Sequence, residues 1–146
     1  MSVELPFAPV DEVIRRNADG LRVSAEAAEE LARKIQQEGA QRATVAAKRA
    51  DKDGRKTLMA ADFDRDTLPE KEALALPIAP VDRVARLDID DRYRVSMDAR
   101  IALASELEAY ADTVAAAAAL LARHADRRTI KSDDIQLYTE LTQYFE

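Results

Sequence analysis

The sequence contains no cysteine and no tryptophan, and only three glycines and five prolines among 146 residues. Without cysteine the chain cannot form a disulfide framework or a thiolate metal site, which fits a reducing interior. Aromatic residues make up 5% of the chain, and long stretches are rich in alanine, leucine, glutamate and arginine. This composition favours helices over a sheet, so we expect an all-α protein.

Long hydrophobic runs are also missing. The longest apolar segment, 114–122, is far shorter than the roughly 20 residues that a membrane-spanning helix needs. The first residues lack the basic flank and apolar core of a secretion signal. We therefore expect a soluble, cytoplasmic protein that has no membrane partner.

The chain has no excess of positive charge. Its net charge is -6 and its pI is about 4.9, which by itself argues against a nucleic-acid partner. Residues 1–65 carry 12 basic and 12 acidic side chains, whereas residues 66–146 carry 10 and 16, and arginine outnumbers lysine by 16 to 6. An acidic, lysine-poor surface indicates adaptation to a salty cytoplasm. There, a screening length of about 3 Å at 1 M salt leaves only close contacts effective.

The sequence repeats itself. Leu-Pro-Phe-Ala-Pro-Val-Asp at 5–11 returns as Leu-Pro-Ile-Ala-Pro-Val-Asp at 76–82, and Arg-Val-Ser at 22–24 returns at 94–96. Arg-Lys-Thr at 55–57 returns as Arg-Arg-Thr at 127–129. The repeat indicates one structural unit used twice. We expect domains at 1–65 and 76–146, joined by a polar linker at 66–75 that Pro69 interrupts.

Each unit predicts a short helix, a long helix and a short helix. Pro9 and Pro80 suit a first helical turn, so we expect short helices at about 9–17 and 80–88. Ser24 and Ser96 are good N-caps for helices of about 28 residues. Apolar residues form one stripe on each long helix, namely Ala28, Leu31, Ala32, Ile35, Gly39, Ala43, Ala46 and Ala50 on the first and Ala99, Leu103, Leu107, Tyr110, Val114 and Leu121 on the second.

Neither unit can bury so long a helix by itself. A unit of about 65 residues offers no other surface of that length, so we expect the two long helices to cross and cover each other's stripe.

The ordered motifs resemble the archaeal histone, end to end and twice over. The resemblance rests on Leu-Pro-x-Ala-Pro-Val-Asp, on Arg-Val-Ser opening the long helix, and on Arg-Lys/Arg-Thr before a last short helix containing an aspartate. It implies two histone folds that form an intramolecular pseudo-dimer, pair their loops across the copies and bend DNA around a convex face. The acidic doublet is similar to histones of salt-loving archaea. A location on the chromosome, in the cytoplasm, follows from the same resemblance.

The resemblance assigns DNA contacts to both copies. Arg22 and Arg94 match the loop arginine that enters the minor groove, a contact that histone octamers also use. The other candidates flank the first helix or belong to the second loop: Arg15, Arg83 and Arg86, and Arg55, Lys56, Thr57, Arg127, Arg128 and Thr129. None of them would read a base edge, so we expect little sequence preference. Glu12 departs from the pattern, because it stands where the second copy has Arg83.

Two of these arginines have a structural role in the family. Arg55 is expected to pair with Asp62, and Arg127 with Asp134, so that each loop is held to the helix that follows it. Removing one partner would leave the other charge unpaired.

The resemblance also implies self-association through a bundle built from the end of the long helix and the last helix. The second copy keeps the family's contact set, which is Leu121, His124, Asp134 and Leu137, whereas the first copy has Arg49, Lys52, Asp62 and Arg65 at the matching positions. We expect two chains to join through their second copies into a closed particle. The alternative is a head-to-tail filament in which Asp134 meets Lys52.

No metal, cofactor, small-molecule substrate or enzyme activity is expected. Asp88, Asp90 and Asp91 lack the glycine and glutamate of a calcium loop, and His124 has no second metal ligand or nucleophile arranged with it. Two functions remain open: a chromatin protein that bends or wraps DNA, and a histone-fold regulator or interaction module. The loop arginines of both copies favour the first, whereas net acidity and Glu12 favour the second.

Overall fold

The structure, a computed structural model, describes residues 2–145. The first unit contains α1 (Phe7–Ala18), β1 (Arg22–Val23), α2 (Ala25–Lys52), β2 (Thr57–Leu58) and the 3-10 turn η1 (Ala60–Phe63). A connecting segment carries the 3-10 turn η2 (Lys71–Ala73). The second unit contains α3 (Ile78–Ala85), β3 (Arg94–Val95), α4 (Met97–His124), β4 (Thr129–Ile130), α5 (Ser132–Leu141) and the 3-10 turn η3 (Thr142–Tyr144). The predicted fold class, two helical units in tandem, is confirmed.

Both long helices begin where the serine caps predict. The Ser24 hydroxyl accepts a hydrogen bond from the Ala27 N–H at 3.0 Å, and the Ser96 hydroxyl accepts one from Ala99 at 3.1 Å. Each cap satisfies one of the N–H groups that have no partner in the first turn of a helix. Both helices are 28 residues long, as the repeat of apolar residues predicts.

The short helices differ from the prediction at their ends. They begin at Phe7 and Ile78, two residues before Pro9 and Pro80, which still lie in the first turn, where a missing N–H breaks no intrahelical hydrogen bond. α3 ends at Ala85, earlier than expected. The loop after it forms its own turn, in which the Asp90 carboxylate accepts a hydrogen bond from the Arg92 N–H at 2.9 Å. Such side-chain to backbone bonds compete with helix continuation.

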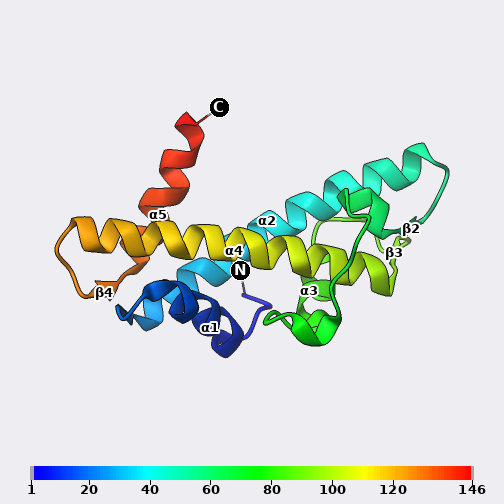
Figure 1. Cartoon of the computed structure of the whole chain (residues 1–146). Coiled ribbons are helices and arrows are strands. Elements are labelled where there is room, and N and C mark those ends of the chain that lie inside the picture. Colours follow the sequence, from blue (N-terminus) through cyan, green and yellow to red (C-terminus); the bar gives the residue numbers. More distant parts are fainter. Residues whose placement is uncertain (1, 146) are drawn as a thin grey trace.

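The long helices cross at the centre of an elongated molecule (Figure 1). Gly39 of α2 marks the closest approach, because a Cβ there would lie 2.7 Å from Val84 Cγ1 of α3 and 2.9 Å from Leu107 Cδ1 of α4. The predicted stripe of α2 is buried along its whole length, and that of α4 is buried except for the half-buried Tyr110 and Leu121. The prediction that the two long helices cover each other is confirmed.

Both units contribute to one hydrophobic core. α1 and α3 each pack against both long helices, and the core cluster joins Ile14 and Ile35 of the first unit to Leu103 and Ile135 of the second. α1 and α3 lie on one side of α4, and α5 projects from the other side (Figure 1). The two units therefore form one folded body, with two different faces.

The last helix is the main difference between the units. The second unit ends in the ten-residue helix α5, whereas the first has only η1, a single four-residue turn, where a short helix was expected. Asp64, directly after η1, adopts a left-handed conformation with φ of 59°, which stops the turn. From there the chain becomes the connection to α3. That connection is not wholly irregular, since it contains η2.

Candidate nucleic-acid interface

The loops of the two units pair at both ends of the molecule. β1 runs parallel to β4, with Arg22 opposite Thr129, and β2 runs parallel to β3, with Thr57 opposite Arg94. The Arg22 N–H donates to the Arg128 carbonyl at 2.8 Å, and the Arg94 N–H donates to the Lys56 carbonyl at 2.8 Å. Each end therefore places a loop arginine of one unit beside the basic residue and threonine of the other.

Three of the sequence-predicted arginines have exposed side chains without an internal partner. Within residues 2–145, no hydrogen bond or ion pair engages the guanidinium groups of Arg22, Arg94 and Arg128. Thr57 and Thr129 lie beside them, half-buried. Exposed cations next to a hydroxyl on a rigid strand pair suit a phosphate backbone, which accepts hydrogen bonds from both.

Arg55 and Arg127 are held inside the protein. The Arg55 guanidinium donates to both Asp62 carboxylate oxygens at 2.8 and 2.9 Å and to the Thr57 carbonyl at 2.8 Å. Arg127 repeats this arrangement with Asp134 and the Thr129 carbonyl. The geometry matches the expected loop-to-helix ion pairs, and it leaves these two guanidiniums little capacity for phosphates.

The paired carboxylates also fix the turns that follow the loops. Asp62 accepts a hydrogen bond from the Met59 N–H at 2.7 Å, and Asp134 accepts one from the Lys131 N–H at 2.8 Å. The hydrogen bonds from Arg55, aided by that from Met59, hold the pKa of Asp62 below its ordinary value despite burial. Asp62 therefore stays ionised at neutral pH.

The basic residues beside the short helices already have carboxylate partners. Arg15 binds Asp11 at 2.6 Å, Arg86 binds Asp82 at 3.1 Å, and Arg83 binds Glu4 at 3.0 Å. All three arginines are exposed, so a phosphate could reach them, but only in competition with these partners. The centre of this face is consequently less cationic than the sequence positions alone imply.

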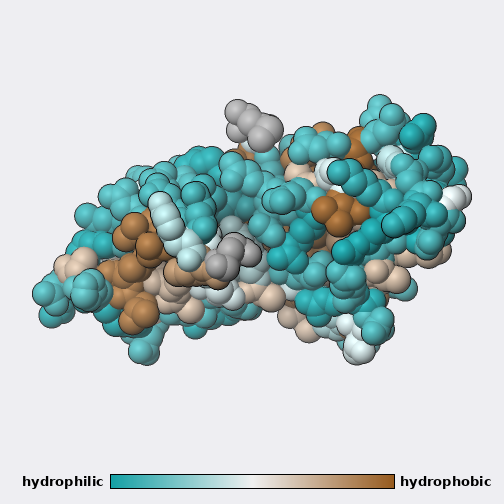
Figure 2. Space-filling model, turned by 90° about the horizontal axis from the view of Figure 1, so that it is seen from above, coloured by the Kyte–Doolittle hydropathy of each residue, from teal (hydrophilic) through white to brown (hydrophobic). Residues whose placement is uncertain are grey.

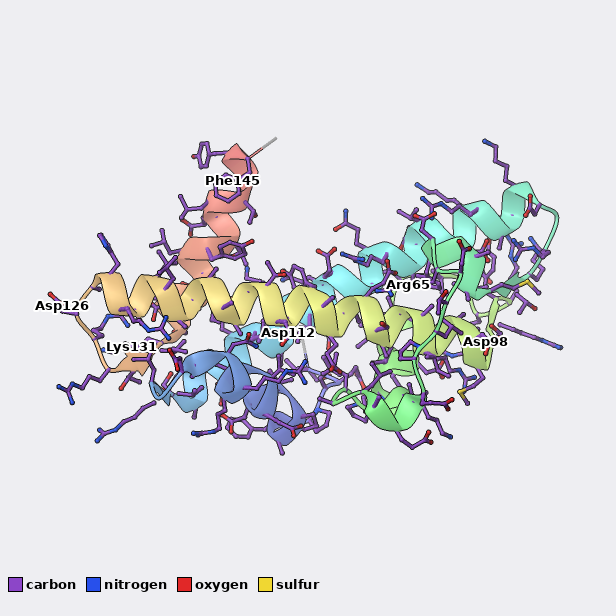
Figure 3. The ribbon with its side chains drawn as sticks, in the orientation of Figure 1. Arg65, Asp98, Asp112, Asp126, Lys131 and Phe145 are labelled. Carbon is purple, nitrogen blue, oxygen red and sulfur yellow. The ribbon has the colours of Figure 1, made fainter. Side chains whose placement is uncertain are left out.

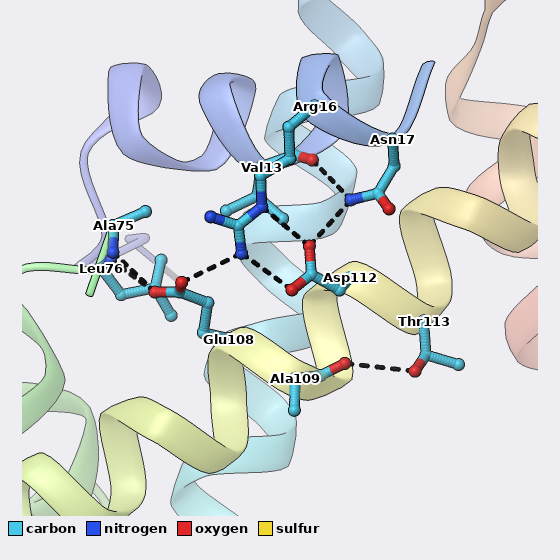
Figure 4. A network of polar contacts seen from close by, with 9 residues as sticks. All are labelled: Val13, Arg16, Asn17, Ala75, Leu76, Glu108, Ala109, Asp112 and Thr113. Atoms are coloured by element: carbon cyan, nitrogen blue, oxygen red, sulfur yellow. Dashed lines mark hydrogen bonds and ion pairs between the residues drawn. The ribbon is translucent and has the colours of Figure 1, made fainter. Parts of the chain in front are cut away.

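One network was not foreseen from the sequence. Arg16 of α1 binds Asp112 and Glu108 of α4, and Glu108 also accepts hydrogen bonds from the backbone N–H groups of Ala75 and Leu76 (Figure 4). Burial opposes the ionisation of Asp112, but hydrogen bonds from Arg16 and Asn17 outweigh it and lower the pKa of Asp112. The signal was present in the departures from the repeat.

Those departures are visible in the sequence. Leu87 stands at the position that matches Arg16, and Ala40 at the position that matches Asp112. Gln36 stands where the second unit has Glu108, and it accepts a hydrogen bond from the Glu4 N–H at 2.7 Å. Both residues therefore anchor the segment before a short helix, and only one of them also binds an arginine.

The self-association residues lie at the end of α4 and on α5. Leu137 is 46% exposed, Leu121 is half-buried and His124 is exposed. Further apolar side chains are exposed nearby, namely Leu120, Leu141, Tyr144 and Phe145. Figure 2 shows hydrophobic surface at this end of the face from which α5 projects. Asp134, by contrast, is 2% exposed and is bound by Arg127.

The corresponding end of the first unit is polar. Arg49 donates to the Asp62 carbonyl at 2.9 Å and pairs with Asp64 at 2.9 Å, while Arg42 pairs with Glu106 at 3.1 Å. These ion pairs surround η1, where the second unit has α5. The ends of the two units therefore differ both in charge and in secondary structure.

Other kinds of site find little support in residues 2–145. No group of three or more histidine, cysteine, aspartate or glutamate side chains in this part of the chain is placed to hold a metal ion. Among the helices of the same residues, none is long and apolar enough to cross a bilayer.

Two crossed long helices, flanking short helices and loops paired in parallel define a histone-fold protein with both partners in one chain. The family model described as histone-like transcription factor (CBF/NF-Y) and archaeal histone matches residues 3–64 and again 74–137. The chain belongs to this family. Membership in a family of non-enzymatic proteins agrees with the expectation that the chain is not an enzyme.

Individual relatives are similar in sequence or in fold. The archaeal histone HAN1 of Thermococcus zilligii is 50% identical over 62 residues, which are 42% of this chain and 90% of that protein. The crystal structure of the histone from Methanopyrus kandleri matches with a TM-score of 0.65 at 22% identity, over 90% of each chain. A crystal structure of a Thermus thermophilus protein matches with a TM-score of 0.72 at 15% identity, over 98% of this chain and 99% of that one. At these identities the two structures show the fold alone.

Proposed function

We propose that this chain is a histone doublet that binds double-stranded DNA, bends or wraps it with little sequence preference, and compacts the chromosome. The observation that carries the proposal is the placement of Arg22 and Arg94. Both side chains are exposed, both lie in strands fixed by pairing with the other unit, and they occupy opposite ends of the molecule.

The distance between the ends suits DNA. α4 connects the β3 end to the β4 end and, with 28 residues, is about 42 Å long. The helical repeat of DNA is about 34–36 Å, so two sites separated by such a helix can face successive turns of one groove. Arginine inserted into a narrow minor groove gains from the concentrated negative potential there. DNA that contacts both ends must follow the face between them.

The contacts explain the expected lack of sequence preference. Phosphate and minor-groove contacts position a protein on DNA, whereas base-specific readout uses the major groove. The candidate residues at the two ends are arginine, lysine and threonine on short loops, which suit phosphates and the minor groove. Preference would come from DNA flexibility.

Exchanging both loop arginines for alanine tests the proposal. Arg22→Ala/Arg94→Ala is expected to weaken binding by a similar factor, roughly tenfold or more, on several unrelated duplexes measured at the same salt concentration. Arg65→Ala, on the side of α4 away from the short helices (Figure 3), is the control for loss of a positive charge. Unchanged affinity of the double variant would exclude DNA wrapping through these loops.

A histone-fold regulator is the second candidate function. The net charge of -6 favours it, as do the carboxylates that already occupy Arg15, Arg83 and Arg86. Footprinting of the purified protein on random DNA fragments in high salt separates the two functions. A chromatin protein protects many sites, whereas a regulator protects few.

We also propose that two chains associate through the second unit. The exposed apolar side chains at the end of α4 and on α5 support a symmetric contact there, and the ion pairs around η1 oppose one at the other end. The head-to-tail filament receives less support, because Asp134 is buried against Arg127 and is not free to meet Lys52. The association would place a closed two-chain particle on the chromosome.

The setting of this function is also part of the proposal. The acid excess of residues 66–146 and the preference for arginine over lysine support a salty cytoplasm, where DNA binding depends on close contacts. A chromosome-associated protein of this kind needs no cofactor and no small-molecule substrate.

A further inference from the structure

The two loop ends are built from equivalent positions but carry different charges. Positions in the second unit are related to those in the first by an offset of 72 residues, which matches Lys56 with Arg128. The same offset matches Asp51 at the end of α2 with Arg123 at the end of α4. A carboxylate at one end of the molecule is therefore replaced by a guanidinium at the other.

At the β2–β3 end, Lys56 is held by other side chains. Its ammonium group lies 2.9 Å from the Asp51 carboxylate and 5.5 Å from the centre of the Tyr93 ring. The Tyr93 hydroxyl donates to the same carboxylate at 2.5 Å. This hydrogen bond, followed by the contact with Lys56, keeps the pKa of Asp51 below its ordinary value. A phosphate must displace a carboxylate that is itself fixed by a buried tyrosine.

The loop before β3 adds more negative charge. Asp88, Asp90 and Asp91 are all exposed there. Residues 51–56 and 88–94 together contain five basic side chains and five aspartates, so this end has no net charge. Like charge close to a phosphate reduces the gain from the remaining cations.

At the β1–β4 end, Arg128 has no such partner within the described residues, and Leu21 stands where the other end has Tyr93. Arg123 bonds the Ala18 carbonyl at 3.1 Å and lies 3.7 Å from Asp19, a side chain that is 93% exposed. Residues 19–22 and 123–128 contain four arginines and two aspartates. This end therefore keeps a net positive charge.

We propose that the β1–β4 end is the main DNA anchor of this chain and that the β2–β3 end is internally neutralised, with Asp51 competing with DNA for Lys56. The inference rests on the proposed function, because it concerns how the same DNA is held. β4 directly precedes α5 (Figure 1), so joining two chains through α5 puts the two strong anchors near the middle of the particle. DNA is then held firmly at the centre and loosely at the two outer ends.

Matched double variants test the inequality of the ends in the full chain. Arg22→Ala/Arg128→Ala removes the free cations of one end, and Lys56→Ala/Arg94→Ala removes their equivalents at the other. The dependence of affinity on salt is measured with one duplex by fluorescence anisotropy, and each phosphate contact contributes about 0.9 to the slope. We expect the first variant to lose about two contacts and the second about one or fewer.

Asp51→Asn tests the competition directly, since asparagine still accepts the Tyr93 hydrogen bond but no longer holds Lys56 by charge. We expect it to strengthen DNA binding several-fold, and we expect this gain to vanish when Lys56→Ala is added. Asp66→Asn, an exposed linker aspartate, is the control with the same change in net charge. Arg123→Asp, which introduces the first unit's residue at the β1–β4 end, is expected to weaken binding.

Each result decides something. Equal losses from the two double variants, or no gain from Asp51→Asn beyond that from Asp66→Asn, would overturn the inference and leave DNA binding through the loops intact. No loss from either double variant would remove the proposed function itself.

Discussion

Arg16 of the first unit donates two hydrogen bonds to Asp112 of the second, at nitrogen–oxygen distances of 2.7 and 2.9 Å. Residues 96 positions apart thus join α1 to α4, and a third bond, to Glu108, ties the same arginine to the segment that leads into α3. The contact links the two repeats at a place where the repeat pattern itself is broken. It shows that neither unit is complete without the other.

We therefore expect that residues 1–66, expressed alone, do not fold as a monomer. The stripe of α2 is covered in the full chain by α4, so the isolated piece would expose it to water. Circular dichroism and sedimentation should show an unfolded chain or a concentration-dependent dimer. A cooperative melt that is independent of concentration, from a monomeric species, would contradict the shared core.

Replacing Asp62 by asparagine is expected to lower the melting temperature on the order of 5 °C, because it weakens the buried acceptor of Arg55. Asp53→Asn is the matched control: Asp53 also bonds Arg55, at 3.1 Å, but it is 71% exposed. Its loss should change stability little. Equal effects of the two variants would argue against a structural role for the buried pair.

The stabilisation from Asp62 should depend on pH in one direction. Its pKa is lower in the folded protein than in the unfolded chain, where aspartate has a pKa of about 3.9, so the contribution is complete above that value. It is lost as the pH falls through the folded pKa. The difference in melting temperature between the wild type and Asp62→Asn should thus be constant from about pH 5 to pH 7 and shrink below about pH 4. A difference that grows on acidification would reverse the assigned sign.

Gly39→Ala is expected to destabilise the protein although alanine favours helices. The gain in helix propensity is about 1 kcal/mol, whereas overpacking a core costs about 1–3 kcal/mol. The added Cβ would meet Val84 Cγ1 at 2.7 Å, and valine has little freedom to move away. Denaturant melts of the double variant Gly39→Ala/Val84→Ala should show less than the sum of the two single losses. Strict additivity would mean that the close approach is not what keeps glycine at this position.

Leu137→Asp is expected to convert the two-chain particle into single chains in molar salt. The charge would have to be buried at the proposed contact of α5 with its symmetry mate, at a high cost in free energy. Leu121→Asp should act in the same way, while Val45→Asp, an exposed position on α2, is the control. Sedimentation with and without long DNA measures the result, and a ladder beyond two chains per particle would show that assembly is open.

Much of this protein was determined by its sequence alone. The repeat revealed the tandem units, Ser24 and Ser96 marked the starts of the long helices, and the apolar stripes predicted their crossing, because these signals are local or periodic and need no knowledge of distant contacts. The pairing of Arg55 with Asp62 followed from the resemblance and from their short separation along the chain.

Only the tertiary structure decided which charges are free. Lys56 and Arg128 occupy the same position of the repeat, yet one is bound by Asp51 and the other has no partner within residues 2–145. The shortening of the first unit's last helix to η1, and the use of Arg16 to bind α4, likewise depend on residues brought together across the two units. Electrostatic interactions act through space over a few ångströms, so the order of residues along the chain could not reveal them.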